Sequence, residues 1–283
     1  MPNKSKKKMP CRSCKPSPKN KLFNDEIYQS RVKSSEYKDI KNYLPKLENG
    51  KCKMTTAKNS NKNLKLNLGV KHAKKLVFYF AAEEKPIREC AKINHPDQAY
   101  GKYTNAGVVR VDAKGMSTLP YRCPQAYREH GLTYVPHVHL VLSDARCNKW
   151  AEGIYTHQVF CPIDKREVEA TRKAGCALIV NALPFEYFVK CHIPGSVPLP
   201  YTSFPGKLTE KDVDSYLKKS LAHVPKLQQA VMKRKLNLKD VPLIIYCYKS
   251  TCDASHKLEK VLRDMGYTNM KHYKGGILDY FKK

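Results

Sequence analysis

A cysteine between a predicted strand and a predicted helix is the residue of this sequence best suited to covalent chemistry. The apolar segment 241–246 predicts a buried strand, Cys247 follows it directly, and a helix is expected from residue 254. The positive end of that helix, the free backbone amides at its start and the nearby Lys249 favour the thiolate, which is the nucleophilic form. Cys247 is therefore the predicted nucleophile. The alternative is a buried structural cysteine, because free cysteine is among the most buried residue types.

A second thiol lies five residues further on, in the same short loop. Cys252 could attack a persulfide, a sulfenate or a mixed disulfide on Cys247 and so act as a resolving cysteine. The alternative is that Cys252 only packs against the start of the helix, since a short loop can bring two sulfurs within disulfide range without joining them.

Two histidines on one predicted strand form another candidate site. His137 and His139 are two residues apart in the segment 134–144, so both side chains project from the same face. Further ligands could come from Cys123, Cys147, His157 and Cys161. No Cys-x-x-Cys or His-Glu-x-x-His spacing in this segment supports a metal centre. We therefore expect no metal and no cofactor. The histidine pair is only a weak metal candidate, and the alternative is a hydrogen-bonded pair in a tyrosine-rich sheet.

The elements that would position Cys247 alternate along residues 159–283. Helices are expected over 164–174, 209–236 and 254–265, and short buried strands over 176–183, 241–248 and 269–273. Such alternation predicts an α/β fold with a parallel sheet covered by helices on both faces. In sheets of this kind the chemistry lies at the carboxyl ends of the strands, which is where Cys247 falls.

Three segments of this region resemble the rhodanese-like family, in the family's order. LIVNALPFEYFVKCHIPGSVPLP (178–200) is similar to the family's first strand and its Gly-His-Ile-Pro-Gly-Ala motif. IIYCYKSTCDAS (244–255) is similar to the catalytic strand and loop. LRDMGYTNMKHYKGGILDY (262–280) is similar to the closing pattern with its Gly-Gly-Ile. The resemblance covers about the last 120 residues and does not extend to residues 1–155.

The resemblance implies a central parallel sheet flanked by helices, and sulfur transfer as the activity. Cys247 would attack a sulfane-sulfur donor, become a persulfide and pass the sulfur to a thiol acceptor. The backbone amides around the persulfide would come from Tyr248, Lys249, Ser250, Thr251, Cys252, Asp253 and Ala254. Ser255 stands where the family often has a serine at the helix start. Some rhodanese-like proteins carry the same Cys-x4-Cys-x-x-Ser loop.

Several positions depart from the family pattern. The family places an arginine five or six residues after the cysteine to hold an anionic substrate, and those positions are Cys252 and Asp253 here. A carboxylate in the loop repels anions, so the resemblance does not extend to the binding of thiosulfate or phosphate. Asn181-Ala182-Leu183 replaces the Asp-x-Arg turn, Cys191 replaces a glycine, and Tyr280 replaces the final tryptophan. These changes affect the implied substrate more than the implied fold.

The rest of the chain divides into a basic tail, residues 1–75, and a β-rich domain of unknown family, residues 76–158. The net charge of the chain is +28, and residues 1–80 hold 21 Lys and Arg against five Asp and Glu. Residues 1–75 lack a sustained hydrophobic period, so we expect them to be largely disordered. Lysines 4, 6, 7 and 8 could contact nucleic-acid phosphates or form a nuclear address, and the alternative is a solvated tail. Cys11 and Cys14 have zinc-knuckle spacing, but no second pair follows nearby.

The sequence does not have the features expected of a membrane-spanning or secreted protein. The longest apolar run, residues 76–82, has seven residues, far short of a membrane span, and the charged start of the chain precedes no apolar segment. We therefore expect a cytoplasmic location, with the nucleus as the alternative. The eleven cysteines are then expected to be reduced, and reactive, metal-bound or buried rather than paired.

Together these observations predict an intracellular rhodanese-like sulfurtransferase or thiol-redox protein that forms a persulfide on Cys247. Cys252 is the candidate resolving thiol, and the expected partners are a sulfane-sulfur donor and a thiol acceptor. The alternative is a catalytically inactive rhodanese-like module that binds a protein partner. In either case a basic segment within residues 1–70 could contact nucleic acid.

Overall fold

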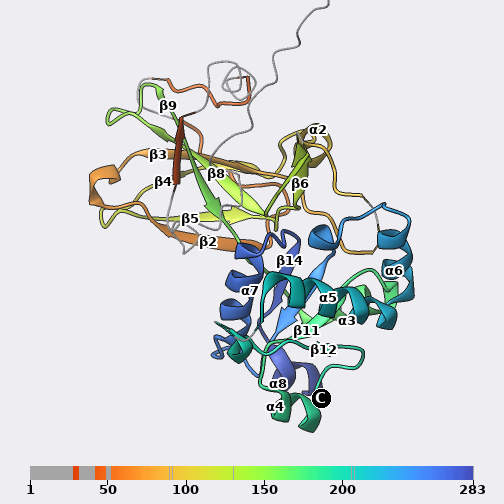
Figure 1. Cartoon of the computed structure of the whole chain (residues 1–283). Coiled ribbons are helices and arrows are strands. Elements are labelled where there is room, and N and C mark those ends of the chain that lie inside the picture. The colour runs from red at the N-terminus through yellow and green to blue at the C-terminus, as the bar shows by residue number, and fades with distance from the viewer. Residues whose placement is uncertain are drawn as a thin grey trace, which may run out of the picture.

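The computed structural model describes residues 28–31, 42–48, 52–88, 90, 92–129, 131–204, 206 and 208–282. A β-rich region comes first and is followed by a region in which helices alternate with strands (Figure 1). The lysines at positions 4, 6, 7 and 8, and Cys11 and Cys14, lie outside the described residues. None of the described helices combines the length and the apolar character that crossing a membrane requires.

The C-terminal region is built on one parallel five-stranded sheet in the order β10-β14-β13-β11-β12. Its strands are β10 (Cys161–Ile163), β11 (Leu178–Asn181), β12 (Val197–Pro198), β13 (Leu243–Tyr246) and β14 (Met270–Tyr273). The helices are α3 (Lys165–Ala174), α4 (Phe185–Lys190), α5 (Glu210–Ser220), α6 (Pro225–Met232), α7 (Ala254–Asp264) and α8 (Gly276–Phe281). Short 3-10 turns are η4 (Tyr201–Ser203), η5 (Leu221–His223) and η6 (Leu238–Asp240). The helices flank the sheet (Figure 1), so the predicted α/β fold class is confirmed.

Local signals in the sequence explain most of these elements. All four residues of β13 are buried, as expected of an apolar strand in the middle of a parallel sheet. A capping box between Asp164 and Glu167 starts α3, and Gly175 ends that helix in the left-handed conformation. The single helix predicted over 209–236 is wrong. It is divided into α5 and α6, because Pro225 cannot continue a helix and instead occupies the first turn of α6.

The β-rich region contains one antiparallel five-stranded sheet, in the order β1-β9-β8-β3-β4, and two strand pairs, β2-β5 and β6-β7. The strands of the large sheet are β1 (Tyr28–Arg31), β3 (Leu76–Ala81), β4 (Ala106–Arg110), β8 (His137–Ser143) and β9 (Trp150–Gln158). The paired strands are β2 (Lys62–Asn67) with β5 (Met116–Tyr121) and β6 (Tyr127–Glu129) with β7 (Leu132–Tyr134). The helix α2 (Pro96–Tyr100) and the turn η3 (Val70–His72) complete the region.

Both faces of β3 are buried. Leu76, Phe78 and Phe80 enter one hydrophobic cluster, while the alternate residues enter another with Leu66 and Leu119. The large sheet is therefore covered on both sides, which explains why the sequence of β3 is a continuous apolar run instead of an alternating one.

Part of the segment predicted to be a disordered tail belongs to this region. β1 pairs with β9, and β2 pairs with β5 over six residues. Ala57 and Leu66 are buried against the β-rich core. The boundary predicted at residue 75 is therefore too late in the chain. A six-residue strand with a single fully buried side chain gives too weak a hydrophobic pattern to be recognised in the sequence.

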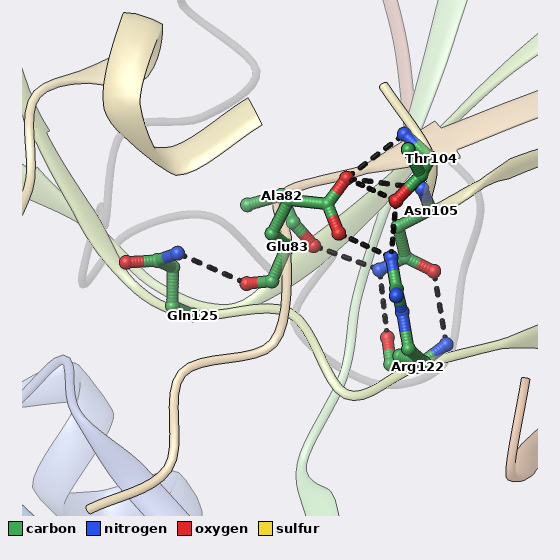
Figure 2. A network of polar contacts seen from close by, with 6 residues as sticks. All are labelled: Ala82, Glu83, Thr104, Asn105, Arg122 and Gln125. Atoms are coloured by element: carbon green, nitrogen blue, oxygen red, sulfur yellow. Dashed lines mark hydrogen bonds and ion pairs between the residues drawn. The ribbon is translucent and has the colours of Figure 1, made fainter. Parts of the chain in front are cut away.

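A polar network in the β-rich region joins three segments between strands (Figure 2). They are the segment after β3, the segment before β4 and the segment after β5. The Glu83 carboxylate, after β3, accepts from the Thr104 amide at 2.8 Å and pairs with the Arg122 guanidinium. Asn105, which is fully buried, donates to the carbonyl oxygens of Ala82 at 2.7 Å and Arg122 at 2.9 Å, and its own Oδ1 accepts from the Arg122 amide at 2.9 Å. The network fixes the chain that follows β5, which leads directly to Cys123.

Two disulfides correct the expectation that the cysteines are unpaired. Cys90 is bonded to Cys176 and Cys123 to Cys161, across Cα–Cα distances of 4.9 and 5.6 Å. Each bond joins the β-rich region to the parallel-sheet region, and Cys161 is the first residue of β10. The free cysteines among the described residues are Cys52, Cys147, Cys191, Cys247 and Cys252.

Replacing Asn105 by alanine is expected to destabilise the fold by about 2–4 kcal/mol, because two buried carbonyls and one buried amide lose their partner. Chemical denaturation followed by circular dichroism measures this loss. Asn67→Ala is the control, since Asn67 is exposed and accepts a single hydrogen bond from the Gly69 amide. Equal stability of the Asn105 variant and the wild type would contradict the role given to the network.

Candidate functional site

Cys247 lies directly after β13, at the carboxyl end of the central strand of the parallel sheet. The Ile277 amide donates to the Cys247 carbonyl at 3.1 Å, and the Leu278 amide donates to the Tyr248 carbonyl at 3.0 Å. Gly276 has φ +65°, and a Cβ there would lie 2.5 Å from the Cys247 carbonyl oxygen. Glycine is thus required where α8 approaches the candidate loop. The position predicted for the nucleophile, at a strand end, is the one observed.

Polar atoms surround the Cys247 sulfur although the residue is fully buried. The sulfur lies 3.4 Å from the Ser255 hydroxyl and 3.3 and 3.8 Å from the carbonyl oxygens of Cys252 and Lys249. The thiol can donate to any one of these oxygens. A sulfur anion would be repelled by the two carbonyls and could be stabilised by the hydroxyl.

The expectation that the helix start lowers the pKa of Cys247 is wrong. Burial raises the pKa of this thiol, and the Cys252 thiol beside it raises the pKa further. Hydrogen bonds from the side chain and the backbone amide of Ser255 lower the pKa of Cys247 but do not offset the loss of hydration. The resting form of the site is therefore the neutral thiol.

The remaining predicted loop residues are divided between the surface and the interior. Tyr248, Lys249, Ser250, Thr251 and Asp253 are exposed, Cys252 is half-buried, and Ala254 and Ser255 are buried. The Cys252 amide donates to the Lys249 carbonyl at 2.9 Å, which makes the loop a tight turn. The Asp253 carboxylate pairs with Lys257 at 2.9 Å, so its charge is already balanced on the surface. The amides of residues 248–254 as the surroundings of a persulfide remain a prediction. The amide beside the Cys247 sulfur here is that of Ser255, which is not in that set.

One residue that contacts the site, His272, was not predicted from the sequence. His272 of β14 is buried, and its Nε2 lies 2.8 Å from the Ser255 hydroxyl. Its ring stacks on Phe160 at a centroid distance of 4.8 Å and meets His256 edge-on at 4.4 Å. The only available signal was the position of His272 on the neighbouring strand. The parallel register of β13 and β14, which pairs Ile245 with His272, could not be read from the sequence.

A cleft of about 670 Å³ borders this group of aromatic rings. Phe160 and His256 line the cleft, and the other residues along its wall come from β2, from β5, from the end of β9 and from α7 with the residue before it. Its charged residues are Asp253, Lys257, Glu259, Lys260 and Arg263. The chain Cys247–Ser255–His272 therefore lies directly behind a solvent-facing wall.

His137 and His139 lie on the same face of β8, as predicted, with their Nε2 atoms 3.1 Å apart. The Nδ1 of His137 contacts the Val135 carbonyl at 2.6 Å, and that of His139 contacts the Thr156 hydroxyl at 2.9 Å. Burial lowers the pKa of His137 to about 4 and that of His139 well below its usual value, so both rings are neutral.

The structure does not bring the other suggested ligands to this pair. Cys123 and Cys161 are joined in a disulfide, and the thiol of Cys147 lies beside the Ser143 hydroxyl at 3.4 Å. His157 lines the cleft behind α7 instead. Across the part of the chain that the structure describes, no three His, Cys, Asp or Glu residues are arranged to hold a metal ion.

Comparison with known proteins identifies the region that carries Cys247. Residues 164–283 match the family model of the Rhodanese-like domain, so the C-terminal part of the chain is a rhodanese-like domain and the predicted resemblance is confirmed. No curated protein matches the chain.

Two solved structures are similar to the chain over part of its length. The human single-domain sulfurtransferase TSTD1 is 18% identical, with a TM-score of 0.29, and the match covers 43% of this chain and 96% of that one. An uncharacterized protein from Saccharomyces cerevisiae is also 18% identical, with a TM-score of 0.29, over 43% of this chain and 90% of the other.

We expect Cys247 to react with a small alkylating agent more slowly than the exposed Cys191 at neutral pH, because its sulfur is buried and burial raises its pKa. The rate at Cys247 should still be rising with pH where that of an ordinary thiol has levelled off. Peptide mass spectrometry after timed alkylation measures both residues in one sample. Faster modification of Cys247 than of Cys191 at neutral pH would contradict the buried neutral thiol.

Proposed function

We propose that the protein is a sulfurtransferase that carries sulfur as a persulfide on Cys247. The observation that supports this most directly is the position of the Cys247 sulfur in a rhodanese-like domain, at a strand end and within 3.4 Å of the Ser255 hydroxyl. A buried thiol surrounded by hydrocarbon could not form an anion, whereas this one has a hydroxyl and an amide beside it that favour the anion.

The reaction consists of two displacements at sulfur. The Cys247 thiolate attacks the outer sulfur of a donor R–S–S⁻, the donor's S–S bond breaks, and R–S⁻ leaves as Cys247 becomes a persulfide. An acceptor thiolate then attacks the outer sulfur, which breaks the new S–S bond and regenerates the Cys247 thiolate. Both steps require an ionised sulfur nucleophile.

Cys252 can serve as the resolving thiol. Its carbonyl lies 3.3 Å from the Cys247 sulfur, and its thiol is close enough to raise the pKa of Cys247. Attack of the Cys252 thiolate on the inner sulfur of the protonated persulfide, Cys247–S–SH, would break its S–S bond, form a Cys247–Cys252 disulfide and release HS⁻. Because Cys252 is half-buried and the surrounding loop is exposed, opening of this loop would uncover both sulfurs together.

The loop favours a persulfide or polysulfide donor over an oxyanion. It contains no arginine, its aspartate is paired with Lys257, and the sulfur faces two carbonyl oxygens. A doubly charged oxyanion such as thiosulfate would find no bidentate partner in the loop itself.

Incubation with a polysulfide donor should add sulfur to Cys247 of the wild type, and Cys247→Ser should abolish both the adduct and sulfur transfer to a small thiol. Intact-protein and peptide mass spectrometry detect the added sulfur, and release of HS⁻ or of the acceptor persulfide measures transfer. Thiosulfate should give at least about tenfold less product than the polysulfide, which corresponds to the loss of one charge-assisted contact.

Cys191→Ser is the matched control, because Cys191 is a free, exposed cysteine of the same domain. Cys252→Ser should still accept sulfur on Cys247 but should not form the Cys247–Cys252 disulfide. A wild-type protein that gains no sulfur on Cys247 with either donor would rule out the proposed activity.

A second function, that of a catalytically inactive binding module, is favoured by two observations. The Cys247 sulfur is fully buried with a raised pKa, and α4 exposes three large apolar side chains, Phe185, Tyr187 and Val189, each more than half exposed. Surface patches of this kind often mark protein–protein contacts. On this proposal, partner binding persists in Cys247→Ser and is lost when these three residues are replaced by polar ones.

The basic N-terminal segment provides a place for nucleic acid in either function. Truncation at residue 70 is not a clean test, because it also removes β2, which pairs with β5. Replacing the lysines at positions 4, 6, 7 and 8 by glutamine in the full chain should weaken binding to RNA or DNA. The negative slope of the logarithm of the association constant against the logarithm of the salt concentration should become less steep by up to about 3. Fluorescence anisotropy at several salt concentrations measures both. An unchanged slope would remove this segment from the interface.

A further inference from the structure

Ser255 and His272 form a hydrogen-bonded chain that ends on the Cys247 sulfur. The distances are 3.4 Å from the sulfur to the Ser255 hydroxyl and 2.8 Å from that hydroxyl to Nε2 of His272. The three residues come from three elements, the end of β13, the first turn of α7 and β14. All three are buried, so their relative positions are fixed by the packing of the sheet against α7.

We propose that His272 is a positioning residue that, as a neutral imidazole, directs the Ser255 hydroxyl onto the Cys247 sulfur when that sulfur becomes an anion. The same chain carries the thiol proton away from the sulfur. This inference concerns the ionisation of Cys247 and deepens the proposed sulfur transfer, but its main test does not require that activity.

The proton balance follows from the two directions that each hydrogen bond can take. In the thiol form, the Cys247 S–H donates to the Ser255 oxygen, and the Ser255 O–H donates to Nε2 of His272, whose proton is on Nδ1. On ionisation, the proton of the Cys247 thiol moves to the Ser255 oxygen. The original hydroxyl proton of Ser255 moves to Nε2 of His272, and the proton on Nδ1 of His272 leaves to water. His272 is neutral before and after. The Ser255 O–H now donates to the sulfur anion, while Nε2–H donates to the Ser255 oxygen.

The surroundings keep His272 neutral, as this exchange requires. Burial lowers the pKa of His272 to about 3, and the neighbouring His256 and Lys274 lower it further. The residues paired with His272 on the adjacent strands, Ile245 and Pro162, carry no charge, and Phe160 covers one face of the ring. At the other end of the chain, the titratable group beside Cys247 is Cys252, and Lys249 is exposed in the loop. A charged imidazolium is thus disfavoured at neutral pH, whereas a neutral ring that can donate or accept is available.

The cleft lined by α7 lies next to the His272 end of the chain. Phe160 and His256, which both contact the His272 ring, line that cleft. On the same wall Lys257 and Arg263 are paired with the carboxylates of Asp253 and Glu259, and Lys260 adds a further positive charge. The proton that leaves Nδ1 of His272 passes to water.

Direct titration of the Cys247 thiolate tests the proposal. The ultraviolet absorbance of the full chain is followed against pH, and the same curve of Cys247→Ser is subtracted. Ser255→Ala and His272→Phe should each raise the apparent pKa of Cys247 by about one to two units, the worth of one hydrogen bond to a charged group. The double variant should show a shift no larger than either single one, because both changes break the same chain.

Two further variants separate positioning from a general loss of structure. His272→Gln keeps a side-chain N–H and should recover part of the shift. Ser220→Ala removes another buried serine, whose hydroxyl donates to the Tyr216 carbonyl in α5, and should leave the titration unchanged. If His272→Phe does not fold, the Ser255→Ala and His272→Gln curves still decide the matter.

An unshifted titration in Ser255→Ala, or additive shifts in the double variant, would overturn the inference. Persulfide formation by the wild type is measured separately. If the pKa shifts are found and no persulfide forms, the proposed function fails and the inference on His272 stands. If the persulfide forms and the pKa shifts are absent, the inference on His272 fails and the proposed function stands.

Discussion

Burial of the Cys247 sulfur away from water raises the free energy of its anion, and the contacts of the site determine how far this cost is offset. Two of the three oxygens nearest to the sulfur are carbonyls, which can accept from a thiol but repel a thiolate. Among the described residues beside the sulfur, Ser255 provides the hydrogen bonds that lower the pKa of Cys247, through its hydroxyl and its amide. The sulfur is therefore held as a buried thiol, and the stability of its anion depends on the two hydrogen bonds from Ser255.

The fold meets this requirement with elements that are distant in the sequence. β13 delivers the sulfur, α7 delivers Ser255 in its first turn, and β14 delivers His272 in register with Ile245. Phe160, which stacks on His272, lies in the short connection from β9 to β10. One wall of the site is thus contributed by the chain that leaves the β-rich region, although the family motif begins only at residue 164.

The sequence was sufficient for the residues whose role depends on local order along the chain. The apolar run of β13, the cysteine that follows it and the helix start at Ala254 are adjacent, so their junction could be predicted. His272 could not be, because it depends on strand order and register, which a single sequence does not show. The low pKa predicted for Cys247 was wrong because burial of its sulfur, which depends on tertiary packing, outweighs the hydrogen bonds from Ser255 at the helix start. The same limit applies to the disulfides, whose partners are 86 and 38 residues apart.

The covalent and polar links between the two regions indicate that the β-rich region supports the site from outside. The Cys123–Cys161 disulfide anchors the first residue of β10, one position after Phe160. On the other side of that disulfide, the Glu83 network holds the chain leading to Cys123. The Arg128 guanidinium reaches the buried Asp240 carboxylate at 3.1 Å, close to the start of β13. These contacts lie on both sides of Phe160 and β13, whereas β13 and β14 are joined by their own backbone ladder, so the β-rich region supports the aromatic wall of the site and not the sheet itself.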